Sequence, residues 1–296
     1  MPIFFCIFIT TSLLICHPTG DKEIEKEGSS VVKQVDHILL VQEDPRGLYD
    51  FLTKDLGLPV AWQYRKYKDF ESGGVFAGNV NLEALSLLSG AGSAPSKIAG
   101  FAFEPSSTTD EIIKELDRRQ IAHEEPQVFE MGPEGSRIKL WTNTIIENML
   151  PGSFVFICEY HIYKLYKVDA KAMRRKLKND LEKADGGTLG IKYVSEIKIK
   201  LKDKAGALKR WQNLLKPYEC FKDGCFGIGK GPSLRFMESD QDYIYSLKIK
   251  VKSIKKAGDF LSAKGLVRTQ DDHTVITNPE KTFGILFEFS EIEGDY

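Results

Sequence analysis

Residues 35–58, VDHILLVQEDPRGLYDFLTKDLGL, begin with a short apolar strand and continue into a helix. The strand, residues 35–41, is interrupted by one aspartate and by His37. A proline suits the first position of the following helix, residues 45–55, and Gly57 suits the position just after its last turn. A histidine on an apolar strand directly before a helix is either a hydrogen-bonded core residue or a functional one.

Three further strands are predicted after this helix. AWQYRKY (61–67) has the alternating character of a strand, and a turn at the paired glycines 73–74 precedes a short strand. NVNLEALSLL (79–88) is the last strand. Because side chains alternate along a strand, Glu83 shares a face with Asn81 and Leu85. The unit therefore reads strand–helix–strand–strand–strand.

The same order recurs three times along the chain. The second unit spans residues 98–162, with a helix over 108–121 whose Thr108 and Glu111 have the spacing of a capping box. The third and fourth units follow, at residues 194–239 and 242–291. Such an internal repeat predicts an α+β fold of tandem βαβββ modules, in which paired modules form one curved sheet with helices outside.

The composition bounds the domains and partners. The 296 residues suffice for about two domains. The net charge of −1 gives no global reason to expect nucleic acid as a partner. We expect a first domain at residues 33–165, a helical linker at 166–190 and a second domain at 191–296. The basic cluster 174–176 of the linker is interpreted as a solvated face.

The N-terminal segment differs from the rest of the chain. Residues 1–16 are almost wholly apolar, have the length of a signal-peptide core and end in Cys16. The segment resembles a bacterial lipoprotein signal, although Ile15 departs from that pattern, and residues 17–32 read as a polar tether. We expect a lipoprotein or an exported protein of the cell envelope, with membrane contact only through this segment. An uncleaved anchor and a cytoplasmic protein are the alternatives.

The repeat, together with VDHILLV, DLGLPVAW and NVNLEALSL, resembles the vicinal oxygen chelate superfamily, of the glyoxalase, bleomycin resistance and extradiol dioxygenase type. The resemblance implies two βαβββ modules per cupped sheet, with a divalent metal bound in the cup by side chains from the first and last strands of each module.

The resemblance also implies a set of metal ligands. His37 matches the first-strand ligand, Glu83 the fourth-strand ligand of the same module, and Glu159 in FICEYH the closing ligand of the second module. The remaining position falls near Gly100, which has no side chain to offer. His161 is expected to share a face with Glu159 and to compensate.

One imidazole and two carboxylates suit Zn²⁺, Mn²⁺, Fe²⁺ or Ni²⁺, and the sequence does not choose among these metals. Glu83 and Glu159 are the candidate catalytic bases, with Glu159 preferred because the missing ligand lies in its module. The alternative is a buried hydrogen-bonded network without metal. Nearby aromatic side chains either line the pocket or belong to the core; they are Trp62, Phe70, Phe76, Phe101 and Trp141.

Two functions from different classes remain open. The first is a metal-dependent enzyme, of lyase, isomerase or dioxygenase type, that acts on a small oxygenated or aromatic molecule. The second is a metal-free protein of the same fold that binds or sequesters a small molecule. The oligomeric state is not fixed, and a homodimer is compatible with either function.

The second domain is expected to have lost the set of metal ligands. Glu196 aligns with His37, Glu288 with Glu159, and Arg235 with Glu83, so no histidine remains. Because arginine cannot bind metal but pairs well with carboxylates, we predict an arginine–carboxylate cluster in place of a metal in this domain.

Overall fold

The computed structural model describes residues 29–87, 97–133, 136–161, 169–221 and 224–292. The expected signal segment and most of the expected tether lie outside these residues. β1 starts at Val32, and Val31 is fully buried, so the first domain begins slightly before residue 33. No helix in the described part of the chain is long and apolar enough to span a membrane.

The first domain consists of two βαβββ modules, as predicted. The first module contains β1 (Val32–Val41), α1 (Pro45–Asp50), the π-helical turn η1 (Phe51–Asp55), β2 (Val60–Lys66), β3 (Phe70–Phe76) and β4 (Asn81–Leu87). The second contains β5 (Ile98–Pro105), α2 (Thr109–Arg118), β6 (Gln127–Met131), β7 (Ile138–Ile145) and β8 (Phe154–Tyr160). Together they form one eight-stranded sheet in the order β2-β3-β4-β1-β5-β8-β7-β6.

The second domain repeats this plan with one strand fewer. After the connecting helix α4 (Ala170–Lys183) come β9 (Ile191–Leu201), α5 (Lys204–Leu215), β10 (Cys225–Phe226) and β11 (Ser233–Glu238). The last module contains β12 (Tyr243–Val251), α6 (Ile254–Ala263), β13 (Val267–Gln270), β14 (Thr274–Thr277), the 3-10 turn η2 (Pro279–Lys281) and β15 (Phe287–Glu291). In both sheets the first strands of the two modules pair antiparallel at the centre, as β1 with β5 and β9 with β12.

Local sequence signals account for the helix ends. Asp44 accepts a hydrogen bond from the backbone N–H of Gly47 at 2.8 Å, and Pro45 follows at the first helical position. Gly57 has φ +69°, as the turn after the helix requires. In α2, Glu111 accepts from the backbone N–H of Thr108 at 3.2 Å, as the predicted capping box requires.

The expected turn at Gly73 and Gly74 is wrong, because both glycines lie inside β3. A Cβ on Gly73 would meet the Tyr49 ring at 2.6 Å, and one on Gly74 would meet the Trp62 ring at 2.5 Å. These glycines therefore make room for aromatic rings on the two faces of the sheet rather than turning the chain.

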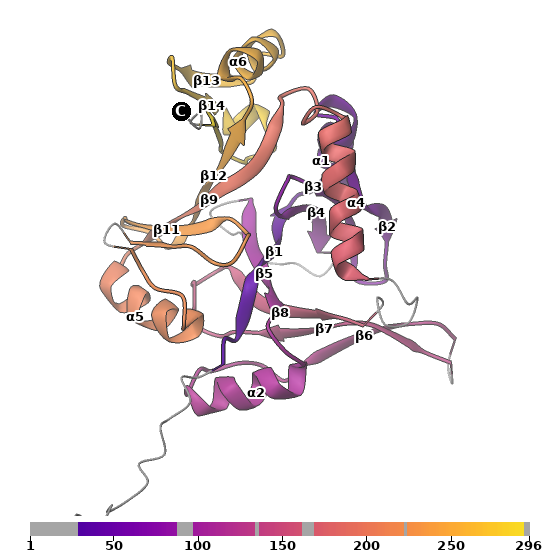
Figure 1. Ribbon diagram of the computed structural model, residues 1–296, viewed down its shortest axis with the longest axis vertical. Helices are drawn as coiled ribbons and strands as arrows, with labels where there is room; N and C mark the ends of the chain where they lie inside the picture. The colour runs from indigo at the N-terminus through magenta and orange to yellow at the C-terminus, as the bar shows by residue number, and fades with distance from the viewer. Residues whose placement is uncertain (1–28, 88–96, 134–135, 162–168, 222–223, 293–296) are drawn as a thin grey trace, which may run out of the picture.

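One hydrophobic core runs through both domains. In Figure 1 the second domain runs from α6 at the top to α5 at the lower left, and the first runs from α1 at the right to α2 at the bottom. Trp211 of α5 is fully buried, and its ring centroid lies 6.0 Å from that of Phe101 and 6.4 Å from that of Phe103. Both phenylalanines belong to β5, so the second domain packs directly on the central strands of the first.

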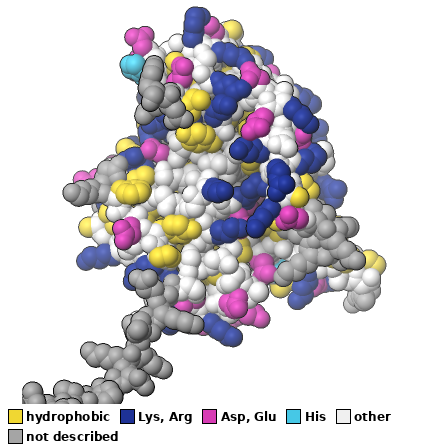
Figure 2. All heavy atoms as spheres, in the orientation of Figure 1, with side chains coloured by type: hydrophobic (Ala, Val, Ile, Leu, Met, Phe, Trp, Pro, Cys, Tyr) yellow, Lys and Arg dark blue, Asp and Glu magenta, His cyan; other side chains and the backbone are white. Residues whose placement is uncertain are grey.

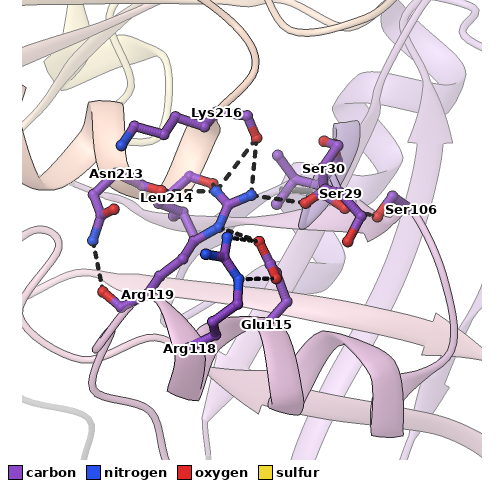
Figure 3. A network of polar contacts seen from close by, with 10 residues as sticks. Ser29, Ser30, Ser106, Glu115, Arg118, Arg119, Asn213, Leu214 and Lys216 are labelled. Atoms are coloured by element: carbon purple, nitrogen blue, oxygen red, sulfur yellow. Dashed lines mark hydrogen bonds and ion pairs between the residues drawn. The ribbon is translucent and has the colours of Figure 1, made fainter. Parts of the chain in front are cut away.

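Arg119 joins the two domains at the end of α2 (Figure 3). Its guanidinium donates to the carbonyl oxygens of Asn213 at 2.8 Å and Leu214 at 3.0 Å, at the C-terminal end of α5. It also donates to the carbonyl oxygen of Ser29 at 2.7 Å and to the Glu115 carboxylate at 2.7 Å. A cation at a helix C-terminus satisfies carbonyl groups that have no partner within the helix.

Candidate functional site

The concave face of the first sheet brings His37 and Glu83 together, as predicted. His37 lies on β1 and Glu83 on the neighbouring parallel strand β4. The His37 Nε2 atom is 3.5 Å from Oε2 of Glu83, and the two side chains are only 7% and 12% exposed. This face also carries an apolar cluster separate from the main core, formed by Leu39, Leu85, Ala99, Ala102, Phe156 and Cys158.

A bulge in β1 adds Asp36 to the same site. Val35 lies opposite Phe103 and His37 lies opposite Ala102, so Asp36 is one extra residue on its strand. The Oδ2 atom of Asp36 is 2.8 Å from Nδ1 of His37, and Asp36 is 5% exposed. The sequence pattern did not predict this pair, because in a regular strand two consecutive side chains point to opposite faces.

The two carboxylates favour a protonated His37. Burial alone would lower the pKa of His37, but the hydrogen bond to Asp36 and the charge of Glu83 raise it above its ordinary value. Burial likewise opposes ionisation of Asp36, whereas the contacts with His37, Arg174 and Tyr160 lower its pKa. Each ring nitrogen of His37 therefore faces a carboxylate.

Tyr160 and Arg174 complete the polar contacts of Asp36. The Tyr160 hydroxyl donates to Oδ2 of Asp36 at 3.1 Å. Arg174 Nη2 lies 3.3 Å from Oδ1 of Asp36 and 3.3 Å from Oε2 of Glu104. Figure 2 shows Lys and Arg side chains gathered around α4, but Arg174 is an exception to the expected solvated face, because it points into the site. No local sequence signal distinguishes it from its basic neighbours.

Trp62 and Ser72 hold Glu83 from the other side. The Ser72 hydroxyl donates to Oε1 of Glu83 at 2.5 Å, and the Trp62 indole N–H donates to the Ser72 oxygen at 3.0 Å. The Trp62 ring also packs edge-on against His37, with 6.1 Å between ring centroids.

Aromatic rings line the rest of the concave face. Phe156 packs edge-on against His37 at 5.5 Å between centroids, and Phe129 stacks on Trp141 at 5.2 Å. Of the five predicted candidates for the pocket, Trp62, Phe70 and Trp141 lie on this face. The other two, Phe76 and Phe101, belong to the main core.

Two asparagine oxygens on this face lack a partner. Asn81 is paired with His37 across β4 and β1, and Asn143 is paired with Cys158 across β7 and β8, so both share the concave face. The Oδ1 atom of each is buried and has no hydrogen-bond partner within the described residues. A buried acceptor without a partner is unusual in a folded protein and marks a place where a ligand or water can donate.

Glu159 does not join His37 and Glu83, contrary to the predicted ligand set. It lies on the opposite face of β8 from Cys158 and Tyr160, and its Oε2 accepts from the backbone N–H of Thr109 at 2.9 Å and from the Thr109 hydroxyl at 2.7 Å. Glu159 therefore stabilises the start of α2. The match of FICEYH to the closing strand of the family was wrong by an odd number of residues. Such an error moves a strand residue to the other face of the sheet.

His161 also lies away from the concave site. Its Nε2 is 2.7 Å from the hydroxyl oxygen of Thr142, and its Nδ1 is 3.9 Å from Oε1 of Glu159. Because Thr142 is paired with Glu159 across β7 and β8, all three side chains share the outer face. His161 therefore cannot compensate for the ligand missing at Gly100.

The second module offers apolar side chains on the concave face beside His37. Ala102 lies directly opposite His37, and its neighbour on β8 is Phe156. At Gly100 a Cβ would meet the carbonyl oxygen of Phe154 at 2.0 Å, so no side chain fits there.

The residues present therefore do not fit the predicted three-ligand metal centre. No group of three or more His, Cys, Asp or Glu side chains suited to a metal ion occurs in the described ranges. We derive no metal-dependent role for Glu83 or Glu159.

The second domain carries the predicted arginine–carboxylate pair. Arg235 donates from Nε to Oε2 of Glu196 at 3.0 Å and from Nη2 to Oε1 at 2.8 Å. Glu288 is bound instead by Lys198 and by the Ser246 hydroxyl, each at 2.5 Å. The prediction is confirmed for Glu196, whereas Glu288 pairs with a lysine.

Comparison with solved structures identifies the architecture. A hypothetical protein from Staphylococcus aureus aligns over 88% of this chain and 99% of its own, with 13% identity and a TM-score of 0.54. A 2,3-dioxygenase from a Pseudomonas species aligns over 90% and 94%, with 11% identity and a TM-score of 0.51. The chain has a two-domain glyoxalase-like fold.

An extradiol ring-cleaving dioxygenase from B. fuscum has the same glyoxalase-like fold. It aligns over 92% of this chain and 74% of its own, with 11% identity and a TM-score of 0.53. No protein-family model matches the sequence, and no curated protein matches it. At these identities the likeness establishes the fold and not the reaction.

Proposed function

We propose that the concave face of the first domain binds a small molecule that has a planar, largely apolar body and at least one hydrogen-bond donor. The observation that carries the proposal is the apolar character of the second module on this face, where Ala102 lies opposite His37 and Phe156 lies beside Ala102. Because the acidic and imidazole side chains of this site, Asp36, His37 and Glu83, all come from the first module, the face is better suited to hold an organic molecule than to enclose a metal.

The aromatic lining supports a planar ligand. Trp62 and Phe156 flank His37, and Trp141 and Phe70 lie further along the same face. Aromatic rings prefer offset or edge-on contacts with one another, and such contacts add about 0.5–1.5 kcal/mol to the burial of apolar area. A flat ring inserted among these side chains would gain both contributions.

The polar groups support a ligand that donates. Asn81 and Asn143 present buried oxygens without partners in the described part of the chain, and Glu83 presents a carboxylate. Hydroxyl and amino groups would satisfy these acceptors. A phenol combines a planar apolar body with a hydroxyl donor and is therefore the ligand class to test first.

Tryptophan fluorescence gives a direct test. Trp62 and Trp141 line the proposed site, whereas Trp211 is fully buried between the domains. We expect phenol, catechol or 1-naphthol to change the fluorescence saturably. Asn143→Leu should weaken this binding on the order of fivefold, since one hydrogen bond contributes about 1 kcal/mol.

The matched control is Asn179→Leu, at an exposed position of α4, which should leave binding unchanged. Absence of saturable binding by any of the three compounds, with the chain folded, would contradict the proposal. So would equal losses in the two asparagine variants.

A metal-dependent enzyme of this fold is the second candidate. One observation favours it: Nδ1 of His37 is bonded to Asp36, as in metal sites where a carboxylate orients a ligating histidine, and Glu83 lies at the other nitrogen. Equilibrium dialysis against Zn²⁺, Mn²⁺, Fe²⁺ and Ni²⁺ separates the candidates. Stoichiometric metal that is lost in both His37→Ala and Glu83→Gln but kept in Glu159→Gln would favour the enzyme.

A further inference from the structure

The side of the second sheet that faces away from the main core carries a second polar surface. Phe287 and Phe289 of β15 are buried in the core, so Glu288 and Ser290 point to the opposite face. Lys250 of β12 lies directly beside Ser290 in the sheet. This face is remote in sequence from the concave site of the first domain.

Ion pairs within the sheet use both carboxylates of this surface. Each oxygen of Glu196 accepts from Arg235, and Glu288 is bound by Lys198. These pairs leave two further lysines of β12, at positions 248 and 250, without a carboxylate hydrogen-bonded to them among the residues the structure describes.

Lys250 lies beside Ser290 in the sheet, and Lys248 lies two residues away on the same strand. Lys248 lies between Glu196 and Glu288 in the sheet, and Lys250 donates to the carbonyl oxygen of Glu291 at 2.9 Å. Strand β12 therefore places two positively charged side chains next to β15, the strand that carries the Ser290 hydroxyl.

The Ser290 hydroxyl also indicates a ligand at this surface. It is only 8% exposed, and its hydroxyl has no hydrogen-bond partner in the described part of the chain. Thr274 of β14 lies beside it on the side away from Lys250. A buried hydroxyl without a hydrogen-bond partner lowers the stability of the folded chain by about 1–3 kcal/mol. The Ser290 hydroxyl lies between a lysine and a threonine, and a bound acceptor would satisfy it.

We propose that this surface binds an oxyanion group, the phosphate or carboxylate of a small molecule. The hydroxyls would donate to the anion, and the ammonium groups would neutralise its charge through charge-assisted hydrogen bonds. The side chains that bind it are Lys248, Lys250, Thr274 and Ser290.

The experiment is a calorimetric titration of the full chain with inorganic phosphate and, separately, with succinate, at constant ionic strength set by chloride. We expect one saturable site per chain, and the probe that binds more tightly identifies the anion as phosphate or carboxylate. Ser290→Ala and Lys250→Gln should each weaken binding on the order of tenfold, since hydrogen bonds to charged groups contribute about 1.5–3 kcal/mol.

The matched control is Lys255→Gln, an 84% exposed lysine of α6 that pairs with Asp259. It removes the same charge from the same domain and should leave the affinity unchanged. If Lys255→Gln and Lys250→Gln weakened anion binding equally, the binding would reflect only general electrostatic attraction, and the proposal would be overturned. So would the absence of saturable binding by both probes in a chain whose thermal unfolding is normal.

Discussion

The Phe156 ring packs edge-on against the His37 imidazole, with 5.5 Å between the ring centroids. Phe156 lies on the last strand of the second module and shares the concave face with Glu83 of the first. An apolar ring, rather than a metal ligand, therefore adjoins His37 at this position.

Introducing a metal ligand at this position should create metal affinity. We expect Phe156→His to bind Zn²⁺ at least about tenfold more tightly than the parent chain, because a third ligand would then face His37 and Glu83. Equilibrium dialysis measures the difference. Phe156→Leu removes the ring without adding a donor, so a similar gain in both variants would show that space, not ligand number, limits the site.

Glu159→Gln should lower stability without affecting the concave site. The carboxylate accepts two hydrogen bonds from Thr109 at the start of α2, and an anion at a helix N-terminus contributes about 0.5–2 kcal/mol. Urea unfolding measures the loss, and phenol titration of the same variant should match the parent. If Glu159→Gln abolished binding while Glu83→Gln did not, the site would be on the outer face instead.

Arg119→Met should be strongly destabilising. The Arg119 side chain is 3% exposed and satisfies carbonyl groups at the end of α5, so its loss leaves them and Glu115 without a buried partner (Figure 3). We expect the free energy of unfolding to fall by about 3 kcal/mol, measured by urea denaturation. Arg118→Met, at a 60% exposed neighbour, should change it by less than about 1 kcal/mol, and equal effects would refute the assignment.

The Glu115 carboxylate predicts a pH dependence of stability. Hydrogen bonds from Arg118 and then Arg119 outweigh burial and lower the pKa of Glu115 to about 2. Because the folded pKa lies below the unfolded value of 4.5, the stabilisation is present above pH 4.5 and is lost as the pH falls towards 2. The stability gap between the parent and Glu115→Gln should therefore narrow over that range, and a constant gap would contradict the prediction.

The fold was predictable from the sequence because short local sequence patterns specify its helices and strands, and these patterns recur along the chain. The Pro45 start and Gly57 end of the first helix and the Thr108–Glu111 capping box all act within a few residues. His37 and Glu83 were predicted from the family resemblance of the first module, and the structure brings them together on one face.

The rest of the site depends on relations that no local pattern contains. Glu159 was placed on the wrong face because FICEYH fixes the existence of a strand but not its register against β5 and β7. Asp36 reaches the site through a bulge, and Arg174 reaches it from a helix that is distant in sequence. These are tertiary features, and only the assembled sheet reveals them.

Trp211 also bears on how the two halves of this duplicated chain can exist. Its ring rests on Phe101 and Phe103, and the core that contains all three is continuous from one sheet to the other. A fragment cut between the halves would expose this apolar contact on both pieces. The two halves therefore stabilise one another through this contact.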